Sequence, residues 1–534
     1  MHATRPFHAT RPFHATRPFK VPLVVILGLL VLVSMLVSVP AFPATFTVDP
    51  AGDDANAGDS TAPWRTVQHA ASTVTAGGRI EIRPGNYIES VSLTRSGTAD
   101  SPIVFAAEPG AILMSPDPHA SMEAFDIAPG TGYLTLLGIE ATGGFDETIF
   151  LRAGTHDIRI EGCTLHDNHA GIILDGASNI TVEHCSLHHN GTLGIRIAGG
   201  SHDVTINDTD SFMNANGMEC SSMIDGFTAE PDTTGITFNR ARAYGNGGDG
   251  FDLQGDHVTL NDVESSDNAC TGIKLDQNAV IRGCLVVANN RGIAVSSVNG
   301  GSMVDMAQCT VAANHGVALD LRNPLVPNRT YGVQVRNSIL TGDFKAIQYV
   351  RGAMLSEAHN IFFRPSPYDP VIAPVSEHGT TGHDINIGRW ARRANLGDGT
   401  LAVDPLFVDA VNGDFRVAST SPAVGRGEPL DGATTLPNIG LYQVPTGPTN
   451  HSPWADAGRN RIGGVNRKLR FDATGSLDPD GAALSYRWDF GDGSDAVAGF
   501  RVTHAFSAPG MYAVTLTVSD GSLSGQTTIQ TTIL

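Results

Sequence analysis

Lysine is scarce in this chain. Only four of its 34 basic residues are lysines (Lys20, Lys274, Lys345 and Lys468), and arginine supplies the rest. The 54 acidic residues outnumber the basic ones and give a formal charge of -20, which argues against nucleic acid as the main partner. Charged residues make up 16% and hydrophobic residues 41%, a composition that indicates neither intrinsic disorder nor a coiled coil. With 534 residues and 60 glycines, the chain is expected to form more than one domain and many turns.

Cysteine is also infrequent, with six residues in the chain. Four of them recur at one position of an internal repeat and are expected to form an inward-facing column instead of disulfides. Cys220 and Cys270 lie outside this pattern, and a bond between them stays open. The column consists of Cys163, Cys185, Cys284 and Cys309.

The amino-terminal segment has the features of a targeting sequence. Residues 2–19 are three copies of His-Ala-Thr-Arg-Pro-Phe, and an apolar run follows over 21–39. Val39-Pro40-Ala41 supplies the small residues of a signal-peptidase site. We therefore expect residues 1–41 to be a leader with a signal peptide and the protein to be secreted, without a membrane segment after cleavage. The alternative is an uncleaved anchor at the cell surface, because the run approaches the ~20 residues of a membrane span.

A degenerate repeat runs through the middle of the chain. Each copy has alternating apolar residues, a small residue or cysteine, an Asn or Asp turn, and then Gly-apolar-x-apolar. Steps of 20–24 residues between glycines are too short for two helices per unit and predict one coil of a parallel β-solenoid. The glycine anchors are Gly171, Gly194, Gly250, Gly272, Gly292 and Gly316.

One anchor is missing between Gly194 and Gly250. Gly226 in IDGFTAE fills this gap with a following step of 24 residues, and Gly217 is the alternative. An asparagine precedes most anchors, where it is expected to tolerate left-handed backbone and to form a ladder between coils. These residues are Asn168, Asn246, Asn268, Asn289 and Asn314. The pattern resembles the right-handed parallel β-helix family, and we assign this all-β domain to 42–443.

A second sequence pattern follows a linker at 444–453. Residues 454–534 alternate apolar and polar residues between turn signals, which predicts a small antiparallel β-sandwich with Trp488 in its core. YRWDFGDG and HAFSAPGMYAVTLTVSDG resemble the PKD domain, an immunoglobulin-like module that would act as a spacer or contact a carbohydrate surface. Its acids, at Asp478, Asp480, Asp489 and Asp492, are expected to stabilise turns instead of binding calcium.

Two outward columns can be derived from the anchors. The residue before each glycine gives Asp225, Asp249, Thr271 and Arg291 in successive coils, and the second residue after it gives Thr228, Asp252, Lys274 and Ala294. Equivalent positions in a solenoid lie ~4.8 Å apart, so three carboxylates and one amine are expected to share an exposed patch. Stacked carboxylates repel each other without a cation, and calcium is the natural hard-oxygen partner.

This constellation predicts a reaction. A metal bound to a uronate carboxylate acidifies the proton on the neighbouring carbon, and a base within reach can start β-elimination. Lys274 is the candidate base, because burial or a nearby cation can lower the pKa of an amine and Arg resists such tuning. The alternative for Lys274 is an ordinary surface ion pair with Asp252.

The same residues resemble the motifs of pectate lyases of polysaccharide lyase family nine. IDGFTAE, GDGFDL and TGIKL occur in the family's order, which implies Asp225, Asp249 and Asp252 as Ca²⁺ ligands and Lys274 as the base. The chain departs from the family at Gly248, where a second adjacent acid is usual. It also has a short segment from Asp252 to Lys274 and lacks the Gly pair after the lysine. Weaker calcium binding or a different substrate is therefore expected.

Other residues of the sequence offer alternative sites. Arg291 and Arg196 are candidates for holding a substrate carboxylate. A glycosidase would use Asp249 and Asp252 but leaves Lys274 without a role. A zinc site beside Cys163 and Cys185 is disfavoured, because these cysteines point inward while the equivalent His166 and His188 are expected to face solvent. The remaining histidines of that group are His169, His184 and His189.

The sequence thus predicts a secreted, calcium-dependent lyase that acts on an acidic polysaccharide, pectate-like, as a monomer. A uronan epimerase would share the same proton abstraction. The alternative from another class is a non-catalytic β-helix protein for surface adhesion or glycan binding, and the loss of an acid at Gly248 favours it.

Overall fold

The computed structural model describes most of residues 44–534. Outside the described residues lie 1–43, 119–120, 216–219, 221–223, 297–301, 322–330, 350–352, 365–369, 375–379, 382–398, 419–420, 431–436, 443–452, 454, 456, 459–460, 474–475, 477–481 and 534. The predicted leader, nearly all of the predicted linker, and Asp478 and Asp480 fall in these ranges. No helix in the described ranges is long and apolar enough to cross a membrane.

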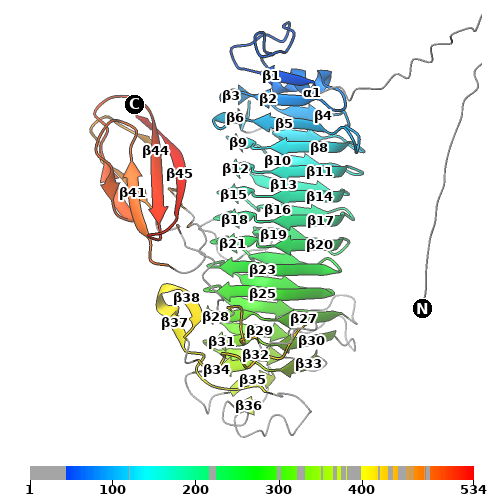
Figure 1. Ribbon diagram of the computed structural model, residues 1–534, viewed down its shortest axis with the longest axis vertical. Coiled ribbons are helices and arrows are strands. Elements are labelled where there is room, and N and C mark those ends of the chain that lie inside the picture. Colours follow the sequence, from blue (N-terminus) through cyan, green and yellow to red (C-terminus); the bar gives the residue numbers. More distant parts are fainter. Residues whose placement is uncertain are drawn as a thin grey trace, which may run out of the picture. The chain divides into compact units, whose positions relative to one another are not determined.

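Stacked parallel strands form the main body of the chain, as Figure 1 shows. The strands belong to a 23-stranded and a 13-stranded sheet, and each pairs with the equivalent strand of the next coil. In the 23-stranded sheet, Ile158 of β11 (His156–Glu161) pairs with Ile180 of β14 (Ser178–Glu183). The column continues through β17 (His202–Asn207) and β20 (Thr234–Asn239). The predicted parallel β-solenoid is therefore confirmed.

The 13-stranded sheet carries the motifs found in the sequence. Its strands follow the chain in order, and all pair in parallel except the last. They are β4 (Val91–Leu93), β7 (Phe125–Ile127), β10 (Glu147–Leu151), β13 (Ala170–Asp175), β16 (Ile195–Ala198), β19 (Phe227–Ala229), β22 (Phe251–Leu253), β24 (Thr271–Leu275), β26 (Arg291–Val295), β29 (Val317–Leu321), β32 (Lys345–Tyr349), β35 (Pro370–Pro374) and β36 (Thr380–Thr381).

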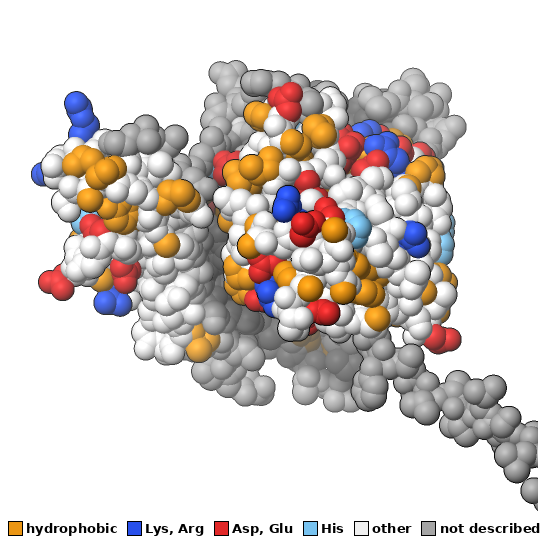
Figure 2. Space-filling view, turned by 90° about the horizontal axis from the view of Figure 1, so that it is seen from above, with side chains coloured by type: hydrophobic (Ala, Val, Ile, Leu, Met, Phe, Trp, Pro, Cys, Tyr) orange, Lys and Arg blue, Asp and Glu red, His pale blue; other side chains and the backbone are white. Residues whose placement is uncertain are grey.

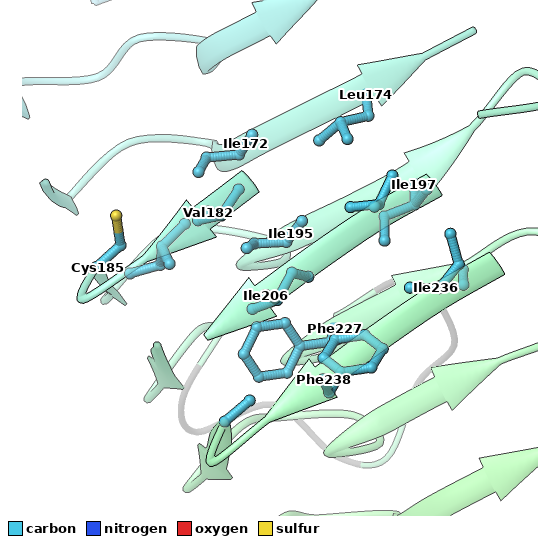
Figure 3. Packing of buried hydrophobic residues seen from close by; sticks show 14 of the residues in the cluster. Ile172, Leu174, Val182, Cys185, Ile195, Ile197, Ile206, Phe227, Ile236 and Phe238 are labelled. Atoms are coloured by element: carbon cyan, nitrogen blue, oxygen red, sulfur yellow. The ribbon is translucent and has the colours of Figure 1, made fainter. Parts of the chain in front are cut away.

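A continuous apolar core fills the solenoid. Alternate strand residues point inward, so Ile195 and Ile197 pack beside Ile206 and Phe227 (Figure 3). At the amino-terminal end, helix α1 (Val67–Thr73) closes the stack; its N-cap Thr66 accepts a hydrogen bond from the His69 N–H. This helix buries its apolar face against the first coil and covers the end of the core.

The glycine anchors are needed because adjacent coils approach closely there. A Cβ on Gly226 would lie 2.6 Å from the carbonyl oxygen of Gly250. Gly226 aligns with Gly194 and Gly250, which confirms it as the missing anchor. The assignment of Gly316 was wrong: Ile293 pairs with Leu319, so residue 318 follows Gly292 in the column. The step from 292 to 318 is 26 residues long.

The predicted asparagine ladder is present and longer than expected. Asn268 Oδ1 accepts hydrogen bonds from the Asn246 backbone and side chain at 3.1 and 2.9 Å, and Asn190 and Asn214 extend the ladder. The expectation of left-handed backbone at these asparagines was wrong. The positive φ angle lies one residue earlier, for example at Asp267. The role of the asparagines is therefore to form buried side-chain hydrogen bonds between coils.

The cysteine column is buried as predicted, and Cys220 and Cys270 form the disulfide that the sequence left open. The prediction that His166 faces solvent was wrong. His166 pairs with His188 and points away from the core, but only 8% of it is exposed, because it stacks on His188 with ring centroids 5.0 Å apart.

The carboxy-terminal domain is a small β-sandwich. A five-stranded sheet faces a two-stranded one, and Trp488 is fully buried between them beside Phe471, as predicted. Asp489 accepts a hydrogen bond from the Gly491 N–H, and Asp492 from Ser494, which agrees with turn roles. Its strands are β39 (Arg461–Gly463), β40 (Leu469–Asp472), β41 (Ser485–Asp489), β42 (Val497–Ala498), β43 (Arg501–His504), β44 (Gly510–Ser519) and β45 (Ser524–Ile533).

Candidate active site

Three adjacent strands of the 13-stranded sheet bring the predicted residues together. Thr228 of β19 pairs with Asp252 of β22, and Asp252 pairs with Lys274 of β24. The column then continues to Ala294, so the predicted second column is confirmed in register. The outward face of these strands carries Asp252 and Lys274 side by side because the residues before and after them point into the core.

Asp225 and Asp249 precede their strands in adjacent coils, as the first column predicted. The Asp249 N–H donates to Asp225 Oδ1 at 2.7 Å, and the Thr271 N–H donates to Asp249 Oδ1 at 2.6 Å. Thr228 Oγ1 donates to the other oxygen of Asp225 at 3.2 Å. Each carboxylate therefore caps the backbone of the next coil, and the two acids are held one coil apart.

The expectation that these columns are exposed was wrong for two of the acids. Asp225 is 2% exposed and Asp252 is 6% exposed. Asp225 turns toward the backbone of the next coil, and Asp252 lies beneath Lys274 and Gln254, whose Nε2 lies 3.2 Å from Asp252 Oδ2. The patch is thus a recessed acidic site.

Burial and mutual repulsion perturb these acids. Burial, followed by the charges of Asp249 and Asp252, raises the pKa of Asp225 to about 7. Burial also raises the pKa of Asp249, and the charge of Asp252 adds to that effect. Two neighbouring carboxylates with raised pKa values indicate a place where positive charge would be stabilising.

Lys274 forms an ion pair with Asp252. The Nζ···Oδ2 distance is 2.8 Å, and 27% of the lysine side chain is exposed. Burial lowers the pKa of Lys274, but the charge and hydrogen bond of Asp252, with the charge of Asp249, outweigh it and raise the pKa above its ordinary value. The predicted lowering of the Lys274 pKa by burial is therefore not found in the protein alone, because the neighbouring acids stabilise the ammonium form.

Gly248, the position where the chain departs from the lyase motif, is tightly packed. A Cβ there would lie 2.4 Å from Asp225 Oδ1 and 2.8 Å from the carbonyl oxygen of Ile224. The space of a side chain at 248 is taken by the carboxylate of Asp225 and the backbone before it. The lack of an acid at position 248 is thus linked to the orientation of the Asp225 side chain, which occupies the space that such an acid would need.

The two predicted arginines lie in their expected columns but are already paired. Arg291 aligns with Thr271 and contacts Asp320 at 3.3 Å. Arg196 aligns with Thr228 and contacts Glu230 at 2.8 Å. Asp320 was missed because the wrong anchor at Gly316 shifted this coil by two residues.

No preformed metal cage accompanies the acids. Within the described ranges, no three His, Cys, Asp or Glu side chains are grouped so as to hold a metal ion as they stand. The donor set nevertheless suits a hard cation, because Asp225 offers a buried carboxylate and Asp249 a half-buried one, both of raised pKa. Asp252 is already engaged by Lys274, so the protein supplies only part of a calcium shell.

Charged residues are mixed on the surface seen from above. Figure 2 shows acidic and basic side chains interspersed with apolar ones on that face, without one continuous basic patch.

The five histidines of the disfavoured zinc site give no such site among the described residues, since Cys163 and Cys185 are in the core.

Two family models match the chain. One, described as "Pel9A-like, right handed beta helix region", matches residues 46–323. The other, described as "PKD domain", matches residues 450–533 and confirms the predicted carboxy-terminal module.

Similar solved structures include a pectate lyase, Pel9A, with 18% identity and a TM-score of 0.42, covering 75% of this chain and 96% of that one. Another is the A-module of mannuronan C-5 epimerase AlgE6 from Azotobacter vinelandii, with 15% identity, a TM-score of 0.41, and coverage of 63% and 93%.

Among curated proteins, a microbial collagenase of Vibrio alginolyticus is 34% identical over 86 residues, 16% of this chain and 10% of the relative. Collagenase ColA of Clostridium perfringens (strain 13 / Type A) is 41% identical over 58 residues, 11% of this chain and 5% of the relative. The chain spans a tenth or less of the length of these curated relatives.

Proposed function

Because the chain belongs to the Pel9A-like right-handed β-helix family, we propose that it is a polysaccharide lyase that cleaves an acidic, pectate-like uronan by β-elimination. The observation that carries the proposal is Lys274, held 2.8 Å from Asp252 beside the stacked acids Asp225 and Asp249. A lysine is a poor choice for charge alone in a chain with four lysines among 34 basic residues. Its position beside these acids fits a base that acts on an anionic sugar.

Calcium is the proposed cofactor. Asp225 and Asp249 would hold it, and water with the carboxylate of the substrate would complete the 6–8 oxygens that calcium takes. When bound, calcium would withdraw charge from the uronate carboxylate and acidify the proton on the neighbouring carbon. Because the protein supplies only part of the shell, we expect calcium to bind more tightly with substrate present than without it.

Lys274 would accept the proton from that carbon. The C–H electron pair forms the new C=C bond, the C–O bond to the next sugar breaks, and the leaving oxygen takes a proton from water. Asp252 positions the amine, and Gln254 steadies Asp252 from the other side. Neutralisation of the neighbouring carboxylates would remove part of the field that raises the pKa of Lys274, so the amine becomes a better base in the loaded site.

Secretion is part of the proposal. The predicted signal peptide over 1–41 supports it, and so does the Cys220–Cys270 disulfide, because disulfides persist mainly in oxidising compartments. The other four cysteines are buried and remain free thiols.

A second candidate is a non-catalytic protein that binds acidic glycans. The observation in its favour is that every acid of the site already has a partner within the chain, such as Asp252 with Lys274. An epimerase would use the same lysine and differ only in returning a proton to the sugar ring.

The test is the ultraviolet absorbance of unsaturated products. Purified protein is incubated with polygalacturonate, alginate and rhamnogalacturonan, with calcium or with a chelator. The proposal expects calcium-dependent absorbance on at least one polymer. Absence of unsaturated product on all three, with the protein folded, would contradict the lyase assignment and leave glycan binding as the function to test.

A further inference from the structure

A second lysine lies on the same outward face as the proposed site. Lys345 begins β32 and pairs with Val317 of β29, and Asp320 of β29 pairs with Ala294 of β26. Ala294 pairs with Lys274 and Asp320 pairs with Gln348, so Gln348 lies three coils beyond the proposed base in its own column. Lys345 lies in that same coil, in the column of Thr271 and Arg291. At ~4.8 Å per coil, three coils span about 14 Å along the solenoid. Lys345 lies beyond the segment that matches the family model.

The surroundings of Lys345 suit a sugar ring. Its Nζ lies 4.8 Å from the ring centroid of Phe344 and donates to Gln348 Oε1 at 3.3 Å. The Phe344 side chain is largely uncovered, with 56% of the residue exposed. An exposed aromatic face packs against the apolar face of a sugar, while an ammonium and an amide offer hydrogen bonds to its polar groups.

Lys345 differs from the arginines of this face in its pairing. Arg291 and Arg196 each contact an acid of the chain, at 3.3 and 2.8 Å. Within the described residues, Lys345 forms no ion pair, and its polar partner is the neutral Gln348. The charge of Lys345 acts on the neighbouring Asp320, where it opposes the rise in pKa that burial causes. An anionic ligand would nevertheless break no direct ion pair of Lys345 when it binds there.

The opposite end of the face is unfavourable for a polyanion. In the coils of β7 and β10, Arg152 is bound to Asp126 at 2.5 Å and to Glu123 at 3.1 Å. Glu147 lies in the same region, where burial and then the charges of neighbouring acids raise its pKa. Acids outnumber the one arginine there, so a carboxylate-bearing polymer is repelled from that end.

We propose that an acidic polysaccharide extends from Lys274 toward the carboxy-terminal coils, and that Phe344, Lys345 and Gln348 form a distal subsite for one of its carboxylate-bearing sugars. That the polymer binds at Lys274 rests on the proposed function. The subsite itself is a binding site and does not require catalysis. An oligosaccharide must span about 14 Å to reach both ends, so long substrates benefit and short ones do not.

The experiment measures binding without turnover. The retardation of the full-length protein is recorded in native gels that contain polygalacturonate or alginate at low ionic strength, for wild type, Lys345→Ala, Lys345→Arg and Lys468→Ala. Lys468 is an exposed lysine of the other domain, so its variant loses the same charge elsewhere. We expect Lys345→Ala to lose about fivefold in affinity, Lys345→Arg to lose less, and Lys468→Ala to match wild type. Where the protein is active, KM should rise for long oligomers only.

The outcomes separate the two proposals. If no unsaturated product forms but Lys345→Ala still binds a uronan more weakly than Lys468→Ala, the subsite holds and the lyase function fails. Equal binding by Lys345→Ala, Lys468→Ala and wild type would overturn the subsite even if the protein is an active lyase. Failure of wild type to bind any uronan would overturn it as well.

Discussion

Restoring the acid that the lyase motif usually carries at position 248 should harm the site. A Cβ at Gly248 would lie 2.4 Å from Asp225 Oδ1, and 2.8 and 2.9 Å from the backbone oxygen and carbon of Ile224. The Asp225 side chain could rotate away, but the contacts with Ile224 are with backbone atoms, which a change of rotamer does not move. Overpacking of this kind costs about 1–3 kcal/mol. Gly248→Asp adds a third charge beside two carboxylates whose pKa values are already raised, so we expect the upper part of this range.

The assay is urea unfolding with and without calcium, for wild type, Gly248→Ala, Gly248→Asp and Gly191→Ala. Gly191 is a matched control, because its φ is not positive and the nearest atoms to a Cβ there are 3.7 Å away. Both Gly248 variants should unfold at lower urea and gain less stability from calcium, since Asp225 is displaced. If Gly248→Asp keeps its stability and binds calcium more tightly than wild type, the packing argument is refuted.

Three further predictions concern the fold. Asn268→Ala should lower the free energy of unfolding by about 3 kcal/mol, because it leaves buried groups of the ladder unpaired; urea unfolding of this variant measures the loss. Burial lowers the pKa of His166, but Asp167 and Glu140 outweigh it and raise that pKa to about 9, above the unfolded value of 6.5. Its contribution of about 3 kcal/mol is complete below pH 6.5 and is lost as pH rises through 9, so the fall in stability over that range should be absent in His166→Gln. Cys220→Ser should cost up to about 4 kcal/mol for a separation of 50 residues, and reduction of wild type should match it in thermal unfolding.

Much of the fold could be predicted because a solenoid converts sequence repeats into spatial columns. The glycines at 226, 250 and 272 mark close contacts between coils, so counting from them placed Asp252 next to Lys274 correctly. The same counting failed at Gly316, because the coil after Gly292 contains 26 residues and the true position holds Ala318. A glycine near the expected position was mistaken for the anchor, and Asp320 was missed as a result.

The columns of equivalent positions in the sequence could not predict how deeply the acids are buried or in which direction the pKa values of the site are shifted. Asp225 is buried because its side chain turns to accept the Asp249 N–H, a choice of rotamer that the sequence does not encode locally. Lys274 has a raised pKa because Asp252 contacts it at 2.8 Å, which outweighs burial. The space at Gly248 also depends on the rotamer of Asp225. The sequence shows that the motif lacks an acid at position 248, but only the structure shows that the Asp225 side chain occupies the space.

The central claim is that Lys274 removes a proton from the carbon next to a uronate carboxylate, and one measurement tests it most directly. Wild type and Lys274→Ala are incubated with polygalacturonate and with alginate in deuterated water with calcium, and the products are analysed by mass spectrometry. The account predicts unsaturated chain ends from wild type, and a loss of at least about 100-fold in Lys274→Ala with polymer binding retained. Deuterium on the ring carbon without unsaturated ends would make the protein an epimerase with the same base. Equal product from both proteins, or cleavage to saturated ends, would contradict the claim.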